Sequence, residues 1–228
     1  PADIVIRNGR VVTPRGVSDA DIAIQDGRIT DIGEVPTARQ ELDANGHWVM
    51  PGGVAPHAHV EQMSGMGLMN ADTFETAHRS AAMGGTTTVI SFVPQAKGQR
   101  LRDAMANYAA RAERGAVVDH AFHMIVSATE EPELEADLAA LITGGHRAIK
   151  VFTTYNIMLD DRQILRVLRA AKAYGALGCV HAETDASLAQ AKADLIAAGK
   201  TAPKFHAASH PRMAEIEAIE RLCRFAEY

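Results

Sequence analysis

The pattern of apolar and polar positions predicts strands, and no helix, in the first 50 residues of the chain. Two apolar runs there, residues 4–12 and 22–29, are split by Asn8-Gly9 and Asp26-Gly27. Asn-Gly and Asp-Gly between apolar runs are strong signals for a tight β-hairpin, so we expect two small hairpins. Residues 1–50 are therefore predicted to be the N-terminal part of a small β-sandwich domain.

A different pattern begins near Val49, where apolar strand-like runs start to alternate with helical periodicity. This alternation is typical of an α/β protein built from parallel βαβ units. Glycines at Gly84-Gly85, Gly144-Gly145 and Gly175 stand where left-handed helix C-caps are expected. The predicted strands are residues 49–60, 86–93, 118–127, 147–155 and 177–183. The predicted helices are residues 73–83, 101–114, 132–143, 161–174, 187–198 and 212–228.

The last predicted helix carries an apolar stripe, including Met213, Ile216 and Ile219, that runs to the end of the sequence with no strand after it. A closed (β/α)8 barrel needs about 250 residues. Five parallel strands alone would leave two unpaired sheet edges, which promote aggregation. We therefore expect the chain to be part of a larger protein, whose C-terminal half lies in the same or a separate chain.

Composition and charge exclude some classes of partner. The chain is 47% hydrophobic and has a formal net charge of -5, so it offers no basic surface for nucleic acid or an acidic membrane. No apolar run approaches the roughly 20 residues of a membrane span, and Pro1-Ala2-Asp3 does not resemble a signal peptide, so we expect a cytoplasmic protein. Cys179 and Cys223 are expected to be reduced, buried thiols rather than a disulfide.

Candidate chemistry is concentrated at the ends of three predicted strands. His57 and His59 follow an apolar run, and alternation along a strand puts both imidazoles on one face. Lys150 and His181 each lie on a later apolar run. Any one of these residues alone is more often a satisfied core or surface group. Together, at the carboxyl ends of three strands, they favour a metal site, because imidazole is a common ligand of zinc and related metals.

Other histidines fit this site less well. His120 and His123 lack a third group at ligand spacing and are predicted to be structural. His206 and His210 have the spacing of a helical pair, but Pro211 disfavours a helical conformation at His210, so both are left outside the site.

Five segments, in this order and spacing, resemble the hydantoinase and dihydropyrimidinase family of the amidohydrolase superfamily. They are residues 51–59, 81–88, 149–152 with Tyr155, 181–183 and 206–211. The resemblance spans the whole chain. It implies a partial (β/α)8 TIM-like barrel, containing the first five strands, over residues 51–228, with part of a β-sandwich over residues 1–50. It also implies a homo-oligomer, a tetramer.

The resemblance assigns roles to five residues. It implies two divalent metal ions, with zinc the expected metal. His57 and His59 would hold the more buried ion, and His181 the second. Lys150 would be carboxylated on its amine and would bridge both ions, and Tyr155 would contact the substrate carbonyl.

The implied chemistry is physically reasonable. A buried lysine can lose its proton, and carbon dioxide then converts the amine into a carbamate, which acts as a carboxylate. Two bridged cations about 3.5 to 4 Å apart create a hydroxide at neutral pH and polarise an amide oxygen. The phenol of Tyr155 could stabilise the developing oxyanion. In the family, a further histidine ligand and the aspartate that protonates the leaving nitrogen would come from beyond residue 228.

The predicted function is a metal-dependent hydrolase that opens a small cyclic amide: a hydantoin, a dihydropyrimidine, or a related cyclic imide or ureide. Two alternatives stay open: another cyclic amidohydrolase, such as dihydroorotase or allantoinase, and a non-catalytic dihydropyrimidinase-related scaffold. Relatives of the first kind tend to place an arginine or asparagine soon after His-x-His, where this chain has the methionine-rich residues 60–67. Ala55 and Thr184 replace an aspartate and an asparagine that are common in the family, which bears on the substrate more than on the metal.

Overall fold

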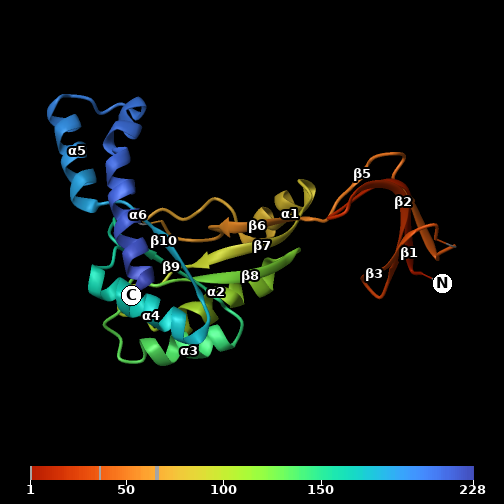
Figure 1. Ribbon diagram of the computed structural model, residues 1–228, viewed down its shortest axis with the longest axis horizontal. Coiled ribbons are helices and arrows are strands. Elements are labelled where there is room, and N and C mark those ends of the chain that lie inside the picture. The colour runs from red at the N-terminus through yellow and green to blue at the C-terminus, as the bar shows by residue number, and fades with distance from the viewer. Residues whose placement is uncertain (1, 36, 65–66) are drawn as a thin grey trace. The chain divides into compact units, whose positions relative to one another are not determined.

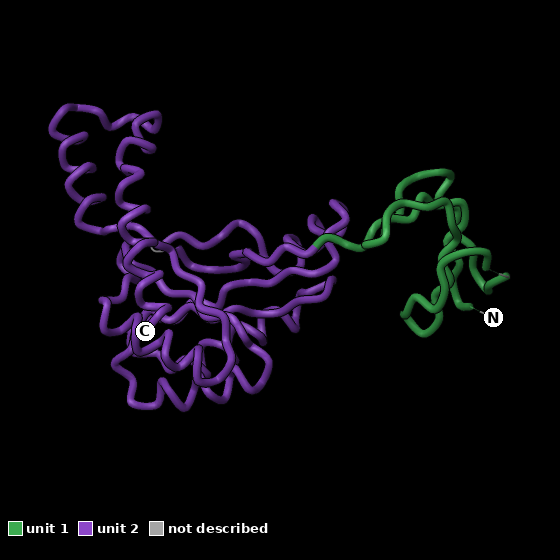
Figure 2. Tube along the Cα trace, in the orientation of Figure 1, with its two compact units in different colours: residues 1–53 green, residues 54–228 purple. Residues whose placement is uncertain are grey.

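The computed structural model describes residues 2–35, 37–64 and 67–228. The chain divides into two compact units, residues 1–53 and residues 54–228 (Figure 2).

The first unit contains a five-stranded sheet with the order β3-β2-β1-β4, and β5 also pairs with β1. Neighbours β1, β2 and β3 are antiparallel, whereas β4 and β5 run parallel to β1. The strands are β1 (Ile4–Thr13), β2 (Gly16–Gln25), β3 (Arg28–Gly33), β4 (Gln40–Asp43) and β5 (Trp48–Val49). The prediction of β structure in this segment is therefore confirmed.

Only one of the two predicted hairpin turns in this unit forms. Asp26 and Gly27, with φ of 51° and 70°, join β2 to β3, as a tight turn with two left-handed residues requires. Asn8 also has a positive φ, but it lies inside β1, where the pairing register with β2 shifts between Ile6 and Gly9. The prediction of a hairpin at Asn8-Gly9 is wrong because this dipeptide forms a bulge within one long strand.

The second unit is an α/β structure with a five-stranded sheet of order β10-β9-β8-β7-β6 (Figure 1). The pairs β7–β8, β8–β9 and β9–β10 are parallel, as predicted. The strands are β6 (Gly53–Ala58), β7 (Thr86–Val93), β8 (Asp119–Ile125), β9 (Ala148–Phe152) and β10 (Leu177–His181). The helices are α1 (Phe74–Met83), α2 (Leu101–Gly115), α3 (Leu134–Thr143), α4 (Asp161–Tyr174), α5 (Asp185–Ala197) and α6 (Arg212–Glu227), with a 3-10 helix η1 (Pro203–Ser209) between α5 and α6.

The two faces of this sheet have different roles. Val93, Met124, Ile149 and Val151 belong to the buried core that the sheet shares with helices α2, α3 and α4. Residues alternate between faces along a strand, so Phe92, His123, Lys150, Phe152 and His181 lie on the opposite face. Strand pairing places Phe92 beside His123 and Phe152 beside His181. The open face of the sheet therefore carries the candidate chemistry.

Local signals explain several helix ends. Asp160 caps α4 by accepting from the backbone N–H of Gln163, whose side chain accepts in return from the backbone N–H of Asp160. Gly175 ends α4 in the predicted left-handed conformation, with φ of 75°. In each Gly-Gly pair only the second glycine is left-handed, with φ of 82° at Gly85 and 108° at Gly145.

Two smaller predictions have mixed outcomes. In the described part of the chain, none of the helices has the length and apolar character needed to cross a membrane. Cys179 and Cys223 are both free, as predicted, but neither is buried, because Cys179 is partly accessible and Cys223 is exposed.

Candidate active site

The His-x-His pair lies at the end of β6 and projects onto the open face of the sheet. The two Nε2 atoms are 3.4 Å apart. Both rings rest on Phe92 of β7, with ring centroids 4.6 Å away for His57 and 5.3 Å away for His59. Burial lowers the pKa of His57, and the nearby His59 and Lys150 lower it further. The lowered pKa favours the neutral imidazole of His57, the form in which histidine binds a metal.

Lys150 lies in the middle of β9 and is almost completely buried, with 9% of its surface exposed. Its Nζ lies 5.9 Å from the ring centroid of Phe92 and 5.1 Å from that of Phe152. Among the described residues, no carboxylate forms an ion pair with this amine. Burial lowers the pKa of Lys150, because the charged form loses its hydration. An amine in this state is more readily deprotonated, which carboxylation by carbon dioxide requires.

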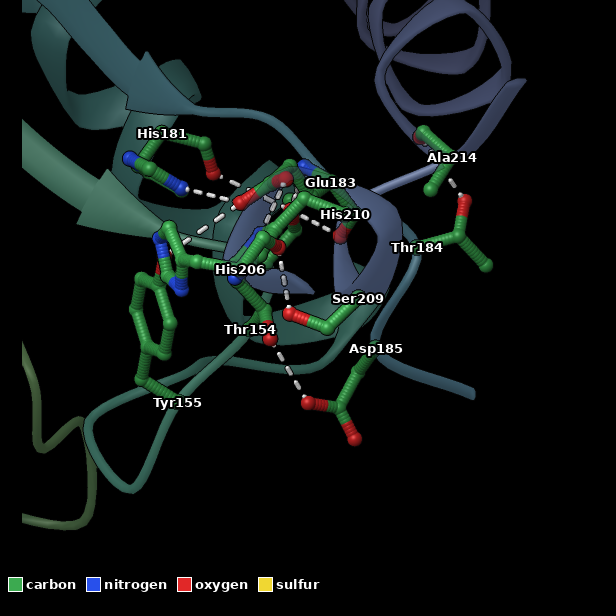
Figure 3. A network of polar contacts seen from close by, with 11 residues as sticks. Thr154, Tyr155, His181, Glu183, Thr184, Asp185, His206, Ser209, His210 and Ala214 are labelled. Atoms are coloured by element: carbon green, nitrogen blue, oxygen red, sulfur yellow. Dashed lines mark hydrogen bonds and ion pairs between the residues drawn. The ribbon is translucent and has the colours of Figure 1, made fainter. Parts of the chain in front are cut away.

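His181 ends β10 and joins a second polar cluster with Glu183, His210 and Tyr155 (Figure 3). Glu183 bridges two histidines: its Oε2 lies 2.7 Å from His181 Nε2, and its Oε1 lies 2.9 Å from His210 Nδ1. Partial burial opposes ionisation of Glu183, but hydrogen bonds from His181 and His210 outweigh it and keep the pKa of this carboxyl low. The cluster therefore carries an anionic carboxylate.

Tyr155 reaches the same cluster from the loop after β9. Its hydroxyl donates to Glu183 Oε2 at 3.4 Å, a long hydrogen bond, and its ring centroid lies 5.1 Å from that of His181. Burial and the neighbouring Glu183 raise the pKa of Tyr155, which keeps the phenol protonated as a donor. Tyr155 has a φ of 72°, a strained conformation for a non-glycine residue. Such strain is often found at functional sites.

A cavity of about 840 Å³ opens between these residues and the loop after β6. His59, Phe152 and Tyr155 line it, as do Met63 and Met69. Arg111 is the one lysine or arginine among its described lining residues, and its Nη1 donates to the carbonyl of Glu61 at 2.8 Å. Most of the lining surface of the cavity is apolar, although polar side chains such as Gln95 and Asn107 also line it.

The five predicted residues fall into two adjoining groups. His57 and His59 lie with Lys150 around Phe92, and His181 lies with Tyr155 on the neighbouring strand and loop. Across residues 2–35, 37–64 and 67–228, no three histidine, cysteine, aspartate or glutamate side chains are close enough together to hold a metal ion. The donor chemistry nevertheless fits a divalent cation, because two imidazoles face each other beside a lysine of lowered pKa.

Three members of the site are not predicted from the sequence. Pro211 predicts that His210 lies outside the site, and this prediction is wrong because the 3-10 helix η1 turns His210 toward Glu183. Glu183 belongs to the segment 181–183, but its position between two histidines depends on His210, which is distant in sequence. Gln62, which accepts a hydrogen bond from His59 Nδ1 at 3.1 Å, had no recognisable sequence signal. His123 packs on Phe92 at 5.1 Å and so lies on the site face.

Comparison with known proteins agrees with the resemblance in the sequence. No family model matches the chain. The D-hydantoinase of Rhizobium radiobacter is 41% identical over 99% of this chain and 50% of its own length. The D-hydantoinase of Ralstonia pickettii is 40% identical with the same coverage. The chain thus spans about half the length of the curated relatives it matches.

Solved structures give the same result. A structure described as D-hydantoinase matches with a TM-score of 0.93 and 39% identity, covering 99% of this chain and 50% of that one. The dihydropyrimidinase from Brevibacillus agri matches with a TM-score of 0.91 and 35% identity, covering 98% of this chain and 49% of its own. A dihydroorotase matches with a TM-score of only 0.53 and 18% identity, which shows a shared fold alone. The chain is therefore a homologue of hydantoinases and dihydropyrimidinases over about half of their length.

Proposed function

We propose that these residues belong to a metal-dependent hydrolase that opens cyclic amides of the hydantoin or dihydropyrimidine type. The observation that carries the proposal is the open face of the sheet, where His57, His59 and His181 lie at the carboxyl ends of β6 and β10, and Lys150 lies two residues before the end of β9. That end of the strands is where active sites of (β/α)8 barrels lie. We propose that β6 to β10 are the first five strands of such a barrel and that the first unit is part of a β-sandwich.

The proposed metal ligands are the four residues predicted from the sequence. His57 and His59 would hold one divalent ion through their Nε2 atoms, His181 would hold a second, and carboxylated Lys150 would bridge them. When bound, the ions, with zinc the expected metal, would polarise the ring carbonyl and activate water at neutral pH. The lowered pKa of Lys150 supports the carboxylation, because the free amine is the species that forms the new N–C bond.

Tyr155 and Glu183 have separate tasks in this proposal. Tyr155 is kept protonated and lines the cavity, so its hydroxyl can donate to the oxyanion that develops on the ring carbonyl. Glu183 holds the ring of His181 through its Nε2 atom. Binding of a metal ion at that nitrogen would require Glu183 to release it, and the carboxylate would stay bonded to His210.

The character of the cavity favours a neutral ring with an apolar substituent. Met63, Met69 and Ile157 offer apolar surface beside the polar group of His59 and Tyr155. Arg111, the one cationic side chain among the described lining residues, already donates to a backbone carbonyl. Among the described lining residues, a substrate that carries a carboxylate, such as dihydroorotate, would find no lysine or arginine other than Arg111 to pair with.

A substrate panel tests this function on the purified whole protein. Hydrolysis of dihydrouracil and of a hydantoin with an aromatic 5-substituent would be measured beside that of dihydroorotate and allantoin. We expect turnover of the first two, with the aromatic hydantoin preferred. Activity confined to dihydroorotate or allantoin would refute the hydantoinase assignment, and no hydrolysis of any ring by metal-loaded protein would favour a scaffold.

A further inference from the structure

Gln62 is a buried amide directly behind the His-x-His pair, and only 6% of its surface is exposed. Its Oε1 lies 3.1 Å from His59 Nδ1, the ring nitrogen that points away from His57. Its Nε2 donates to the hydroxyl of Tyr108 at 2.8 Å and to the carbonyl of Phe92. All polar atoms of this side chain are therefore engaged, and the directions of these hydrogen bonds can be worked out.

The hydroxyl of Tyr108 donates its one hydrogen to the carbonyl of Val60. Because that hydrogen is used, the hydroxyl can only accept from Gln62 Nε2. The Phe92 carbonyl is likewise an acceptor and requires the NH₂ group of the amide. A flipped amide would set Oε1 against this carbonyl oxygen, where two acceptors repel each other. The orientation of Gln62 is thus fixed, with Oε1 toward His59.

This orientation determines the tautomer of His59. An amide oxygen accepts only, so the hydrogen on the neutral His59 ring must sit on Nδ1. The other nitrogen, Nε2, is then left with a free lone pair, and it is the nitrogen that lies 3.4 Å from His57 Nε2. We propose that Gln62 is a positioning residue that holds His59 in its Nδ1–H form and so keeps Nε2 ready to bind a metal ion.

The backbone around Gln62 is held in place independently. Glu61 has a φ of 50°, a strained conformation that turns the chain back toward His59. Arg111 Nη1 donates to the Glu61 carbonyl at 2.8 Å, and the Glu61 carboxylate accepts from the backbone N–H of Phe74 at 3.1 Å. The backbone N–H of Gln62 donates to Asn70 Oδ1 at 2.7 Å. Contacts from two helices and one loop therefore fix the position of this amide.

This inference rests on the proposed function, because the tautomer matters only if His59 binds a metal ion. The tautomer itself can be measured without metal. In metal-free protein labelled with 15N-histidine, at mildly alkaline pH, NMR of the ring nitrogens distinguishes a protonated Nδ1 from a protonated Nε2. We expect His59 to be predominantly the Nδ1–H tautomer in the wild type. A wild-type ring that is predominantly Nε2–H overturns the proposal, whether or not the protein binds metal.

The variant Gln62→Met keeps an unbranched side chain of similar size but removes the acceptor. We expect it to lose the preference for Nδ1–H and to bind Zn²⁺ about 10- to 100-fold more weakly than the wild type, the usual cost of losing such a supporting hydrogen bond. Zn²⁺ affinity would be measured by competition with a chromophoric chelator. If Gln62→Met does not fold, the wild-type NMR result decides the question alone.

Gln95→Met is the matched control. Gln95 is also 6% exposed and lines the same cavity, but its Oε1 accepts from the backbone N–H groups of Ser127 and Ala128. We expect this variant to bind Zn²⁺ as the wild type does. Equal affinity in Gln62→Met and the wild type would overturn the role of Gln62, as would an equal loss in both variants. Absence of Zn²⁺ binding in the wild type would instead contradict the proposed function.

Discussion

Replacing Lys150 by methionine should separate the structural role of its side chain from the chemistry of its amine. The amine of Lys150 lies over the rings of Phe92 and Phe152, and the residue is 9% exposed. Methionine is unbranched and of similar volume, and volume-conserving changes in a core usually cost less than about 1.5 kcal/mol. The change also removes an amine whose charged form is disfavoured by burial. The free energy of unfolding of Lys150→Met should therefore lie within about 1.5 kcal/mol of the wild type.

The effect on metal binding should be far larger. The carboxylated amine would be the one anionic ligand shared by both ions, so its loss should reduce the bound metal from about two ions per subunit to less than one. Ring opening should fall to background. Lys150→Ala should show the same losses, and short carboxylic acids such as acetate should partly restore activity by filling the space of the missing bridge.

Elemental analysis, chemical denaturation and a hydantoin assay would be performed on the same preparations. Lys172→Met, which changes an exposed lysine of α4 in the same way, is the control and should match the wild type in all three. Full metal content and full turnover in Lys150→Met would show that the amine is no bridge. A variant that fails to fold would show instead that the lysine is needed for structure.

Three further changes test other parts of the structure. Tyr155→Phe should keep its metals and fold, while turnover of a hydantoin falls by about 10² to 10³, the usual cost of one oxyanion donor; unchanged turnover would remove Tyr155 from the mechanism. His78 is fully buried, and its ring nitrogens have no hydrogen-bond partner among the described residues. Burial, and to a smaller extent the nearby His120, lowers the pKa of His78 below the ordinary value of 6.5. The unfolded chain then binds more protons, so stability should fall as pH drops below about 6.5. His78→Phe should reduce this fall, and equal pH profiles of unfolding would contradict the reasoning. Gly175→Ala should lower the free energy of unfolding by about 1 kcal/mol, because an alanine is strained at the φ of 75° found there. No atom of the described residues lies near the added methyl group, so the cost comes from the backbone conformation and not from a clash. An unchanged denaturation midpoint would contradict this reasoning.

The sequence predicted the alternating strands and helices well where local signals agree. Strand β7 (Thr86–Val93) and helix α4 (Asp161–Tyr174) have the predicted limits, and α4 has a capping box at one end and a left-handed glycine at the other. The strand predicted over residues 147–155 ends at Phe152, where the side chain of Thr153 donates to Glu183 after β10 and that of Thr154 donates to Asp185 at the start of α5. Apolar composition alone does not mark that point.

The bulge at Asn8 shows a second limit of local signals. Asn-Gly is equally suited to a hairpin turn and to a left-handed bulge, and the choice is made by partners distant in sequence. The backbone N–H of Asn8 donates to Asp21, and its side chain donates to Asp43. A Cβ atom at Gly9 would lie 2.8 Å from Val49 Cγ2, so β5 requires a glycine there. None of these contacts can be read from the dipeptide.

In the candidate site, too, local sequence patterns predict some residues, whereas contacts between distant segments determine the others. His57, His59, Lys150 and His181 could be proposed because each lies in or directly after an apolar run, and these runs come in a recognisable order. Their supporting residues could not. Gln62 acts on His59 only because Tyr108 and Phe92 fix its amide, and His210 meets Glu183 only because η1 turns the chain. Both sets of contacts join segments that are far apart in sequence, and their hydrogen bonds leave no periodic pattern.

Metal content of the purified whole protein tests the proposed site most directly. Protein prepared without chelator would be analysed for zinc, manganese, iron, cobalt and nickel, and the total would be divided by the concentration of folded subunits. Two bridged ions predict about two metals per subunit. A value near zero in folded protein, unchanged after incubation with zinc and bicarbonate, would contradict the assignment of His57, His59, Lys150 and His181 as ligands.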